Sequence, residues 1–327
     1  MSAAGEHNTM TSTRLQNLPV SFFSSVMGLA GLAIALQRAG ELWAPLHPFG
    51  LLVAVLSALV FIALTGLYAA KLFRYRAEAV AELTHPVKMS FGATFSVSLV
   101  LLSVAFLSSQ PALSFWLWAV GAGLHLVFTL YVLSAWIHKE NFDINHISPA
   151  WFIPVVGNIL VPVAGVAHAS AELSWFFFSI GLLFWIVLFT IIVYRMIFHN
   201  PLPDKLLPTL FILIAPPAVG FISYIKLTGD IDSFARVLYY GALFLTLLLF
   251  KELPRFVRLP FYLSWWAYSF PLAAMTVATL IMQAHVPSAF FTFLSWIMVV
   301  VLDLVIVYLL ARTLVAVTRK QICVEGH

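Results

Sequence analysis

Ten long runs of apolar residues restrict this chain of 327 residues to folds that are stable in a lipid bilayer. Each run holds roughly 18 or more residues, enough to cross ~30 Å of hydrocarbon at ~1.5 Å of helical rise per residue. Only helices and closed barrels can span a bilayer, because every backbone polar group must be paired inside the protein. Barrel strands alternate apolar and polar residues, whereas these runs are continuously apolar. The sequence therefore predicts an all-α membrane protein.

The apolar runs define a membrane domain at 19–313, between an N-terminal segment at 1–18 and a C-terminal tail at 314–327. An even number of spans places both termini on the same side of the membrane. The ten predicted helices occupy residues 19–37, 48–73, 86–107, 112–136, 149–169, 173–197, 206–227, 233–250, 260–284 and 288–313.

The positions of the basic residues support this count of spans. Of the 17 Lys and Arg residues, only Arg38, Lys226 and Arg236 fall on the side opposite the termini. Positive residues favour the cytoplasmic side of a membrane, so we expect both termini in the cytoplasm. Topology explains the sequence pI of about 9.2, so the basic residues give no evidence for an anionic substrate, and no nucleic-acid partner is expected.

Prolines inside the spans distinguish the odd-numbered helices from the even-numbered ones. The fifth span contains Pro154 and Pro162, the seventh Pro216 and Pro217, and the ninth Pro271. Each interior proline removes one backbone hydrogen bond and frees a carbonyl group. A free carbonyl is tolerated in a membrane only against protein or a water-filled path. We therefore expect an inner set of odd helices and an outer set of even ones; ordinary kinking of packed helices is the alternative.

Ionisable groups are scarce inside the spans. Asp303 is the one acidic residue well inside a helix, and it is interpreted either as a coupling residue or as a protonated or hydrogen-bonded acid. His125 is the one histidine near mid-membrane, and packing is its expected role. Asn158, beside Gly157, is a candidate for lining a path. The chain shows no paired histidines for haem and no nucleotide-binding or protease motif, so neither a cofactor, a metal site nor an enzyme activity is expected.

Phe270 lies ten residues into the ninth predicted span, directly before Pro271. Helical rise places it at ~15 Å depth, near mid-membrane. A ring beside a proline at this depth is suited to close a lumen. The competing interpretation is that Phe270 is one of the 29 phenylalanines of the chain that simply pack in the core or face lipid.

Five segments of the odd spans resemble one known family in sequence and in order. The ninth span reads WWAYSFPLAAM at 265–275 and the first FFSSVMGLAGLA at 22–33. The others are HPVKMSF (85–91), SPAWFIPVVGN (148–158) and LIAPPAVG (213–220). This set is similar to the tellurite-resistance/dicarboxylate transporter (TDT) family, whose members include plant guard-cell slow anion channels. The resemblance spans essentially the whole chain.

The resemblance implies a fold and a gate. It implies five helical hairpins in a pseudo-fivefold arrangement around a central pore, assembled as a homotrimer in the bacterial inner membrane. It assigns pore closure to Phe270 and a pore-facing position to Phe23. Phe91, Asn158, Ser269 and the interior prolines of the fifth, seventh and ninth spans are expected at pore-lining or kink positions. The long cytoplasmic extensions of the plant proteins are absent from this sequence.

Two transport mechanisms follow from the family likeness. The first is a channel that conducts small inorganic anions, stabilised weakly by backbone and hydroxyl dipoles, because weak sites permit release. The second is a secondary carrier that exports tellurite, sulfite or C4-dicarboxylates by alternating access. A carrier for a carboxylate would need a Lys or Arg at depth, and no Lys or Arg lies deep in the predicted spans. The sequence therefore favours the channel.

Overall fold

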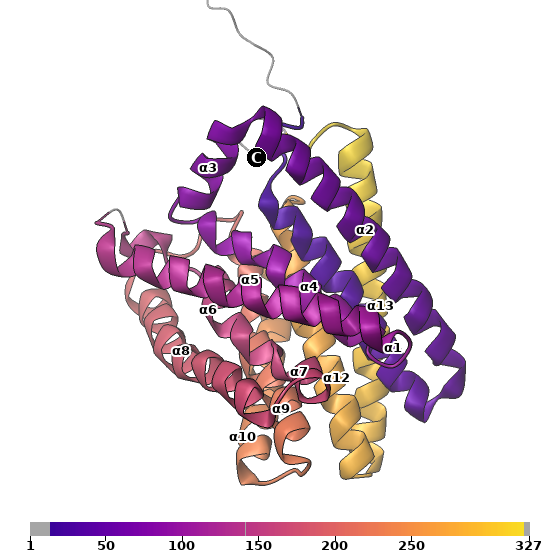
Figure 1. The fold of residues 1–327 in the computed structure, drawn as a ribbon. Helices are drawn as coiled ribbons and strands as arrows, with labels where there is room; N and C mark the ends of the chain where they lie inside the picture. Colours follow the sequence, from indigo (N-terminus) through magenta and orange to yellow (C-terminus); the bar gives the residue numbers. More distant parts are fainter. Residues whose placement is uncertain (1–13, 141, 324–327) are drawn as a thin grey trace, which may run out of the picture.

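Ten helical spans are long and apolar enough to cross a membrane in the residues that the computed structural model describes, 14–140 and 142–323 (Figure 1). The predicted all-α membrane fold is confirmed. The five even-numbered spans are built on single α-helices, namely α2 (His47–Arg74), α5 (Pro111–His138), α8 (Ala171–Phe198), α10 (Ser233–Lys251) and α13 (Ala289–Thr318). They form an outer layer around the remaining spans.

The odd-numbered spans are composite, because each begins with a 3-10 segment. The first joins η1 (Val20–Phe23) to α1 (Ser24–Leu42), and the third joins η3 (Met89–Ala93) to α4 (Thr94–Phe106). The seventh joins η7 (Leu207–Ile214) to α9 (Ala215–Thr228), and the ninth joins η8 (Leu263–Tyr268) to α12 (Ser269–His285). The fifth is the most broken, with η5 (Pro149–Trp151), α6 (Phe152–Val156), η6 (Gly157–Leu160) and α7 (Pro162–His168).

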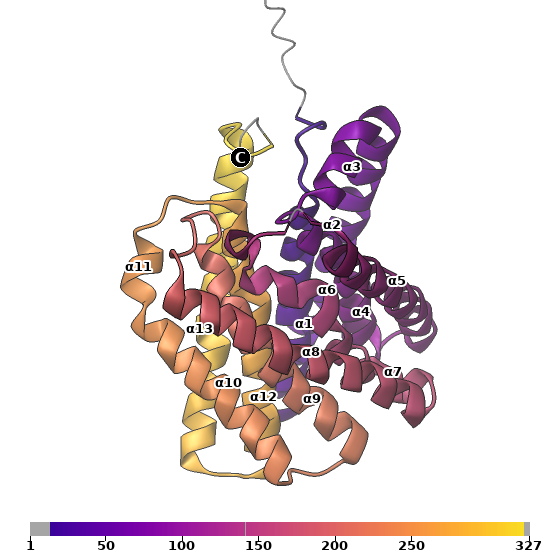
Figure 2. The ribbon, with the colours of Figure 1, turned by 90° about the vertical axis from the view of Figure 1, so that its left-hand side faces the viewer.

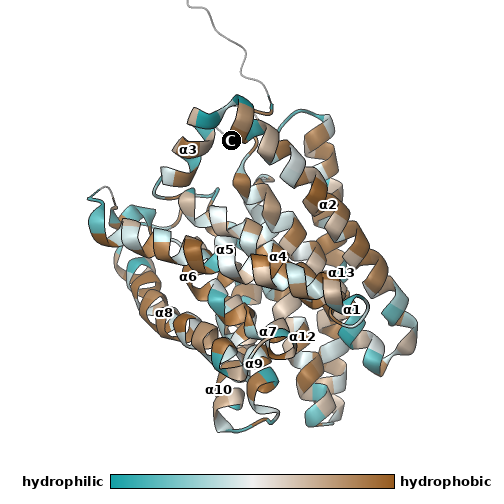
Figure 3. Ribbon diagram, viewed as in Figure 1, coloured by the Kyte–Doolittle hydropathy of each residue, from teal (hydrophilic) through white to brown (hydrophobic). Residues whose placement is uncertain are grey.

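The odd spans are more deeply buried than the even spans, as the positions of the prolines indicated. Between 72 and 83% of residues in the central window of each odd span are buried, against 28 to 39% in the even spans. The outer helices instead expose large apolar side chains, and Figure 3 colours much of α2 and α8 as hydrophobic. Hydrophilic residues gather at the two ends of the bundle (Figure 3). The odd spans are therefore the protein core, and the even spans face the lipid.

The span prolines lie where 3-10 geometry changes to α-helix. Pro162 is the first residue of α7, Pro216 and Pro217 follow the first residue of α9, and Pro271 is the third residue of α12. A first helical turn tolerates proline because its amide hydrogens have no intrahelical acceptor. These prolines therefore mark a change of helix type at the start of each α-segment.

Side chains from neighbouring spans satisfy backbone carbonyls in the broken fifth span. Thr129 Oγ1 of α5 donates to Pro154 O at 2.7 Å, and Trp118 Nε1 of α5 donates to Val161 O at 3.0 Å. An unpaired carbonyl in lipid destabilises a protein by several kcal/mol, so these outer-helix donors make the interruption stable.

Two glycines allow α1 to lie unusually close to α12. A Cβ atom at Gly28 would stand 2.3 Å from Ser269 Oγ, and one at Gly31 would stand 2.8 Å from the Cβ of Ala273. Small residues permit such close approach between transmembrane helices. This contact sets the position of the first turn of α12, which carries Phe270.

The first and last described residues, Arg14 and Cys323, lie at one end of the bundle, called the terminal face here. Arg14 donates to the carbonyl of Val317 at 3.0 Å, which joins the start of the chain to the end of α13. The short helix α3 (Arg76–Thr84) lies at the same face, near the top of Figure 1, and α11 (Leu253–Val257) is visible in Figure 2. Short 3-10 turns occupy two connections, η2 (Ala44–Leu46) and η4 (Ile144–His146). Neither α3 nor α11 was predicted from the sequence.

Candidate functional site

A cavity of about 670 Å³, called the terminal cavity here, enters the protein from the terminal face. Its deeper walls come from all five odd spans. Its mouth is formed by the segment before the first span, by α3, and by the C-terminal tail through Ile322 and Cys323. Ile322 is fully buried there, with 1% of its surface exposed.

A second cavity of about 480 Å³, the distal cavity, enters from the opposite face. Its walls again come from the odd spans, and its mouth carries Arg38, Glu41, Lys226 and His285. The two cavities therefore enter the same ring of inner helices from opposite ends.

Three residues line both cavities: Leu160 of η6, Val219 of α9 and Phe270 of α12. Leu160 and Val219 are buried, with 6% and 3% of their surfaces exposed, and Phe270 is half-buried. We call these three residues the constriction. All three side chains are apolar. They narrow the space between the two cavities, and they offer no polar group that could replace the water around an ion.

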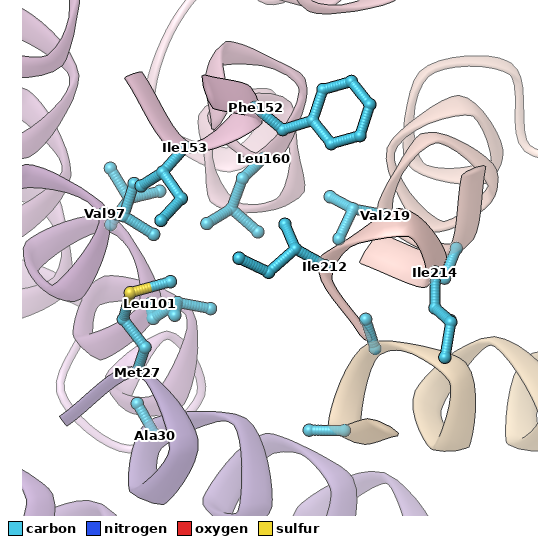
Figure 4. Close-up of a cluster of buried hydrophobic side chains, with 14 of the residues drawn as sticks. Met27, Ala30, Val97, Leu101, Phe152, Ile153, Leu160, Ile212, Ile214 and Val219 are labelled. Atoms are coloured by element: carbon cyan, nitrogen blue, oxygen red, sulfur yellow. The ribbon is translucent and has the colours of Figure 1, made fainter. Parts of the chain in front are cut away.

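Apolar side chains converge on the space next to the constriction. Figure 4 shows Met27, Val97, Leu160, Ile212 and Val219 extending from four different inner spans toward a common centre. Each of these five residues lines the terminal cavity. The deep lumen therefore has a hydrophobic wall, and hydrophobic constrictions in channels gate by excluding water.

Phe270 is held at the constriction by its backbone and by the adjoining helix. It is the second residue of α12, directly after the change from 3-10 to α geometry. A Cβ atom at Gly31 would stand 3.6 Å from Phe270 Cδ2, so the ring lies against the glycine face of α1. No charged partner is needed to position this side chain.

Charged residues concentrate at the cavity mouths. The terminal cavity is lined by Lys71, Lys88 and Lys205 against Glu78 and Glu82, and the distal cavity by Arg38 and Lys226 against Glu41. Each mouth thus carries one more positive than negative group. Such a field raises the local concentration of anions.

Two titratable groups of the terminal mouth lie outside the spans. Burial, then the charge of Lys88 and then His146, holds the pKa of His85 below its ordinary value of 6.5. His85 Nδ1 also accepts from the backbone N–H of Val87 at 3.1 Å, which requires an unprotonated nitrogen. Burial raises the pKa of the Cys323 thiol, against the opposing effects of Arg14 and Lys71.

The sequence-predicted site residues fall into two groups. Phe91, Pro216 and Pro271 line the terminal cavity, together with Phe270. Pro154, Pro162, Pro217 and Ser269 line neither cavity and are buried between helices.

Phe23 and Asn158 were expected beside the pore and lie elsewhere. Phe23 packs edge-on against Phe61, Tyr68 and Phe95, with ring centroids 5.2–6.3 Å apart. It therefore faces the second and third spans. Asn158 is fully buried, and its amide nitrogen donates to Thr129 Oγ1 at 2.9 Å, toward the outer helix α5. Neither residue lines a cavity.

Asp303 lies on the outer helix α13, where it is half-buried, and it lines neither cavity. This placement separates Asp303 from the lumen. It gives no support to a coupling role in transport.

Sequence reasoning missed two of the three constriction residues and the ion pair between Lys71 and Glu82 at the terminal mouth. Leu160 and Val219 are ordinary apolar residues of apolar spans, and nothing in their type identifies them. A lysine near the end of an apolar run, followed by an acidic residue in the next connection, was the available signal for the ion pair.

Comparisons with known proteins agree on one family. The family model described as SLAC1, voltage-dependent anion channel, matches residues 17–314. An uncharacterized transporter of Methanocaldococcus jannaschii is 28% identical over 294 residues, covering 81% of this chain and 84% of the relative. A tellurite resistance protein TehA homolog of Haemophilus influenzae is 27% identical, covering 82% of each chain.

A plant protein extends the likeness. The guard cell S-type anion channel SLAC1 of Arabidopsis thaliana is 25% identical over 283 residues, which cover 84% of this chain and 51% of the plant protein. The TDT likeness predicted from five short segments is thus confirmed over nearly the whole length. With its ten membrane-length helices, five of them surrounding two opposed cavities, the chain is a multi-pass membrane protein that belongs to the SLAC1 family of anion channels and transporters.

Proposed function

We propose that the chain is a channel for small monovalent anions, with a pore through each subunit that Phe270 closes. One observation carries this proposal: two cavities enter from opposite faces and share only the constriction of Leu160, Val219 and Phe270. Movement of one aromatic ring would join the cavities without rearranging the helix bundle. Among the three residues, Phe270 has the largest side chain and sits beside the Gly31 face of α1.

The charge distribution favours anions. Positive groups exceed negative ones at both mouths, and the constriction itself is apolar. An anion at the constriction would meet no acidic side chain and no strong cationic site that would trap it. Fast conduction requires binding weak enough for release, and this lumen provides it.

A secondary carrier exporting tellurite, sulfite or C4-dicarboxylates is the second candidate, favoured by the name of the Haemophilus relative. A dicarboxylate site would require cationic or hydrogen-bonding side chains at depth. The Lys and Arg residues of both cavities instead lie at the mouths. Flux distinguishes the two candidates, because a channel conducts far faster than a carrier cycles and does not saturate at low substrate concentration.

The gate is tested by Phe270→Ala in planar bilayers that contain nitrate or chloride. We expect anion current to rise at least about tenfold, equivalent to a barrier lower by ~1.4 kcal/mol. Phe244→Ala, a lipid-exposed phenylalanine of the outer helix α10, is the matched control and should leave the current unchanged. A folded Phe270→Ala protein with wild-type current would overturn the gate, and equal cation and anion permeability would overturn the anion channel.

We further propose that the protein is a homotrimer in the plasma membrane with both termini in the cytoplasm. The excess of Lys and Arg on the terminal side supports this orientation. Labelling of cysteines introduced at the exposed Gln321 and at Lys226 in intact cells, in a Cys323→Ser background, tests it. Reagents that cannot cross the membrane should reach Lys226→Cys and not Gln321→Cys. Mass measurement of the purified protein in detergent tests the trimer.

A further inference from the structure

Four polar side chains form a cluster behind the broken fifth span. Ser96 of α4, His125 and Thr129 of α5, and Asn158 of η6 are all buried, with at most 3% of their surfaces exposed. Ser96 Oγ lies 2.9 Å from His125 Nδ1, and Asn158 Nδ2 donates to Thr129 Oγ1 at 2.9 Å. The cluster therefore connects the third, fourth and fifth spans at one level.

Two atoms of this cluster, His125 Nε2 and Asn158 Oδ1, have no hydrogen-bond partner among the described residues. His125 is 1% exposed, so water from the surface does not reach it directly. Buried nitrogen atoms of this kind are nearly always paired. An unpaired one requires an explanation, such as a ligand or a bound ion.

The unpaired nitrogen lies against the wall of the terminal cavity. A Cβ atom placed on Gly157 would stand 2.7 Å from His125 Nε2 and 3.4 Å from Val97 Cγ2. Gly157 and Val97 both line that cavity. Only glycine at position 157 allows the edge of the imidazole to approach the cavity wall this closely.

This place is close to the gate. Gly157 precedes Leu160 of the constriction by three residues of 3-10 helix, a rise of ~6 Å. His125 itself lines neither cavity. An ion that has entered the terminal cavity meets the wall at Gly157, directly in front of His125 Nε2, on the terminal side of the constriction. Most of the side chains that line the cavity at this depth are apolar (Figure 4), so one N–H donor would add a polar contact to a mainly apolar wall.

We propose that His125 Nε2, beside Gly157, forms a binding subsite for a partly dehydrated monovalent anion on the terminal side of the gate. Ser96 Oγ lies 3.0 Å from Ala93 O and 2.9 Å from Nδ1. In the proposed subsite its single hydrogen turns from Ala93 O to Nδ1, so the hydrogen of the ring stands on Nε2, where it donates to the anion. A single donor holds the ion weakly enough for it to move on. This inference rests on the proposed anion channel and adds a residue of an outer helix to the pore.

Two substitutions of His125 test the roles of Nδ1 and Nε2 one at a time. The amide nitrogen of glutamine can occupy the place of Nε2, so His125→Gln retains the donor toward the cavity. The amide of asparagine occupies the place of Nδ1, so His125→Asn retains the contact with Ser96 and removes the donor. Gly157→Ala displaces the ring edge, whereas Gly123→Ala on the same α5 helix meets no atom within 4 Å and is the matched control.

The first test uses bromide as the probe and does not depend on the gate, because the terminal cavity is open at its own face. Crystals of the wild-type protein soaked in bromide should show anomalous density beside His125 Nε2. The density should persist in His125→Gln and Gly123→Ala and disappear in His125→Asn and Gly157→Ala. No density in the wild type, or unchanged density in a folded His125→Asn protein, would overturn the subsite.

The second test measures selectivity in the Phe270→Ala background. Reversal potentials should show the nitrate-to-chloride permeability ratio changed at least about twofold by His125→Asn and unchanged by His125→Gln. If the Phe270→Ala channel conducts and His125→Asn leaves the permeability ratio unchanged, the proposed subsite is contradicted. If Phe270→Ala carries no current, the proposed gate is contradicted, and the bromide experiment alone tests the subsite.

Discussion

Lys71 and Glu82 form a buried ion pair of 2.7 Å at the mouth of the terminal cavity. The two side chains are 4% and 9% exposed, and each has further partners. Lys71 Nζ donates to the carbonyl of Leu18, and Glu82 accepts from the backbone N–H of Val20, both at 2.7 Å. The pair thus connects the end of α2, the helix α3 and the entry to the first span.

Removing one partner of this pair should strongly destabilise the protein. Lys71→Met leaves the Glu82 carboxylate buried without its cation, which lowers the free energy of unfolding by about 3–5 kcal/mol. Thermal unfolding in detergent measures the loss. The Lys251–Glu252 pair is the control, since Lys251 is 77% exposed and Lys251→Met should change stability by less than about 1 kcal/mol. A double variant Lys71→Met/Glu82→Gln that is no more stable than Lys71→Met would contradict the pairing.

Close packing between α1 and α12 gives the second prediction. Gly28→Ala brings a methyl group to 2.7 Å from Ser269 Cβ, so the helices must separate and stability should fall by about 1–3 kcal/mol. Gly66→Ala on α2 meets nothing within 4 Å and should be neutral or stabilising by up to about 1 kcal/mol. The melting temperatures of the two variants in one detergent make the comparison. Because α12 carries the gate, Gly28→Ala should also change the current of the wild-type channel, and Ser269→Gly should partly restore both properties.

The sequence was sufficient to predict the ten spans and the division into inner and outer helices. Hydrophobic length and the positions of the prolines follow from the chemistry of the bilayer, which applies to each segment separately. The ends were less accurate. The third and ninth helices were predicted to begin at 86 and 260 and begin at Met89 and Leu263. Residues 86–88 form a turn before the third helix, and residues 260–262 are non-helical, with Tyr262 extended, before the ninth. The last helix continues to Thr318, into the predicted tail.

The candidate site was only partly predictable. Phe270 could be singled out because a ring next to an interior proline is uncommon and because the ninth span matched a family. The rotation of each inner helix about its axis could not be read from a continuously apolar sequence. Phe23 was therefore placed toward the pore, although its ring lies among Phe61, Tyr68 and Phe95. Leu160 and Val219 were not identified for the same reason.

The hydroxyl of Thr129 gives the third prediction. Thr129 Oγ1 lies 2.7 Å from Pro154 O and 2.8 Å from His125 O, so the two carbonyls share its single hydrogen, and the oxygen accepts from Asn158 Nδ2. Thr129→Val keeps the shape and leaves the Pro154 carbonyl and the Asn158 amide without this partner, which should destabilise the protein by about 1–3 kcal/mol. Thr190→Val on α8 removes a hydroxyl that bonds only its own helix at Ile186 O and should be close to neutral. Equal melting temperatures for the two variants would show that Thr129 does not support the broken span.

His85 gives a prediction about pH at the terminal mouth. Its pKa lies below 6.5, because of burial first, then Lys88 and then His146, so the ring is neutral at pH 7. As the pH on the terminal side falls through the lowered pKa, His85 gains a positive charge at the mouth. Anion current through the Phe270→Ala channel should then rise, by up to about twofold at low ionic strength and less at high salt.

His85→Gln separates this effect from other titrations. The substituted channel should lose the part of the acid-dependent increase in current that comes from His85, while its current at pH 7.5 stays as before, because both side chains are neutral there.

Folding stability should change in the opposite direction to the current. A histidine whose pKa is lowered on folding binds fewer protons in the folded state, so the free energy of unfolding decreases as the pH falls below 6.5. His85→Gln should flatten that decline as well. A pH profile of current identical in the two channels between pH 7.5 and 5 would contradict the assignment of this charge to the channel mouth.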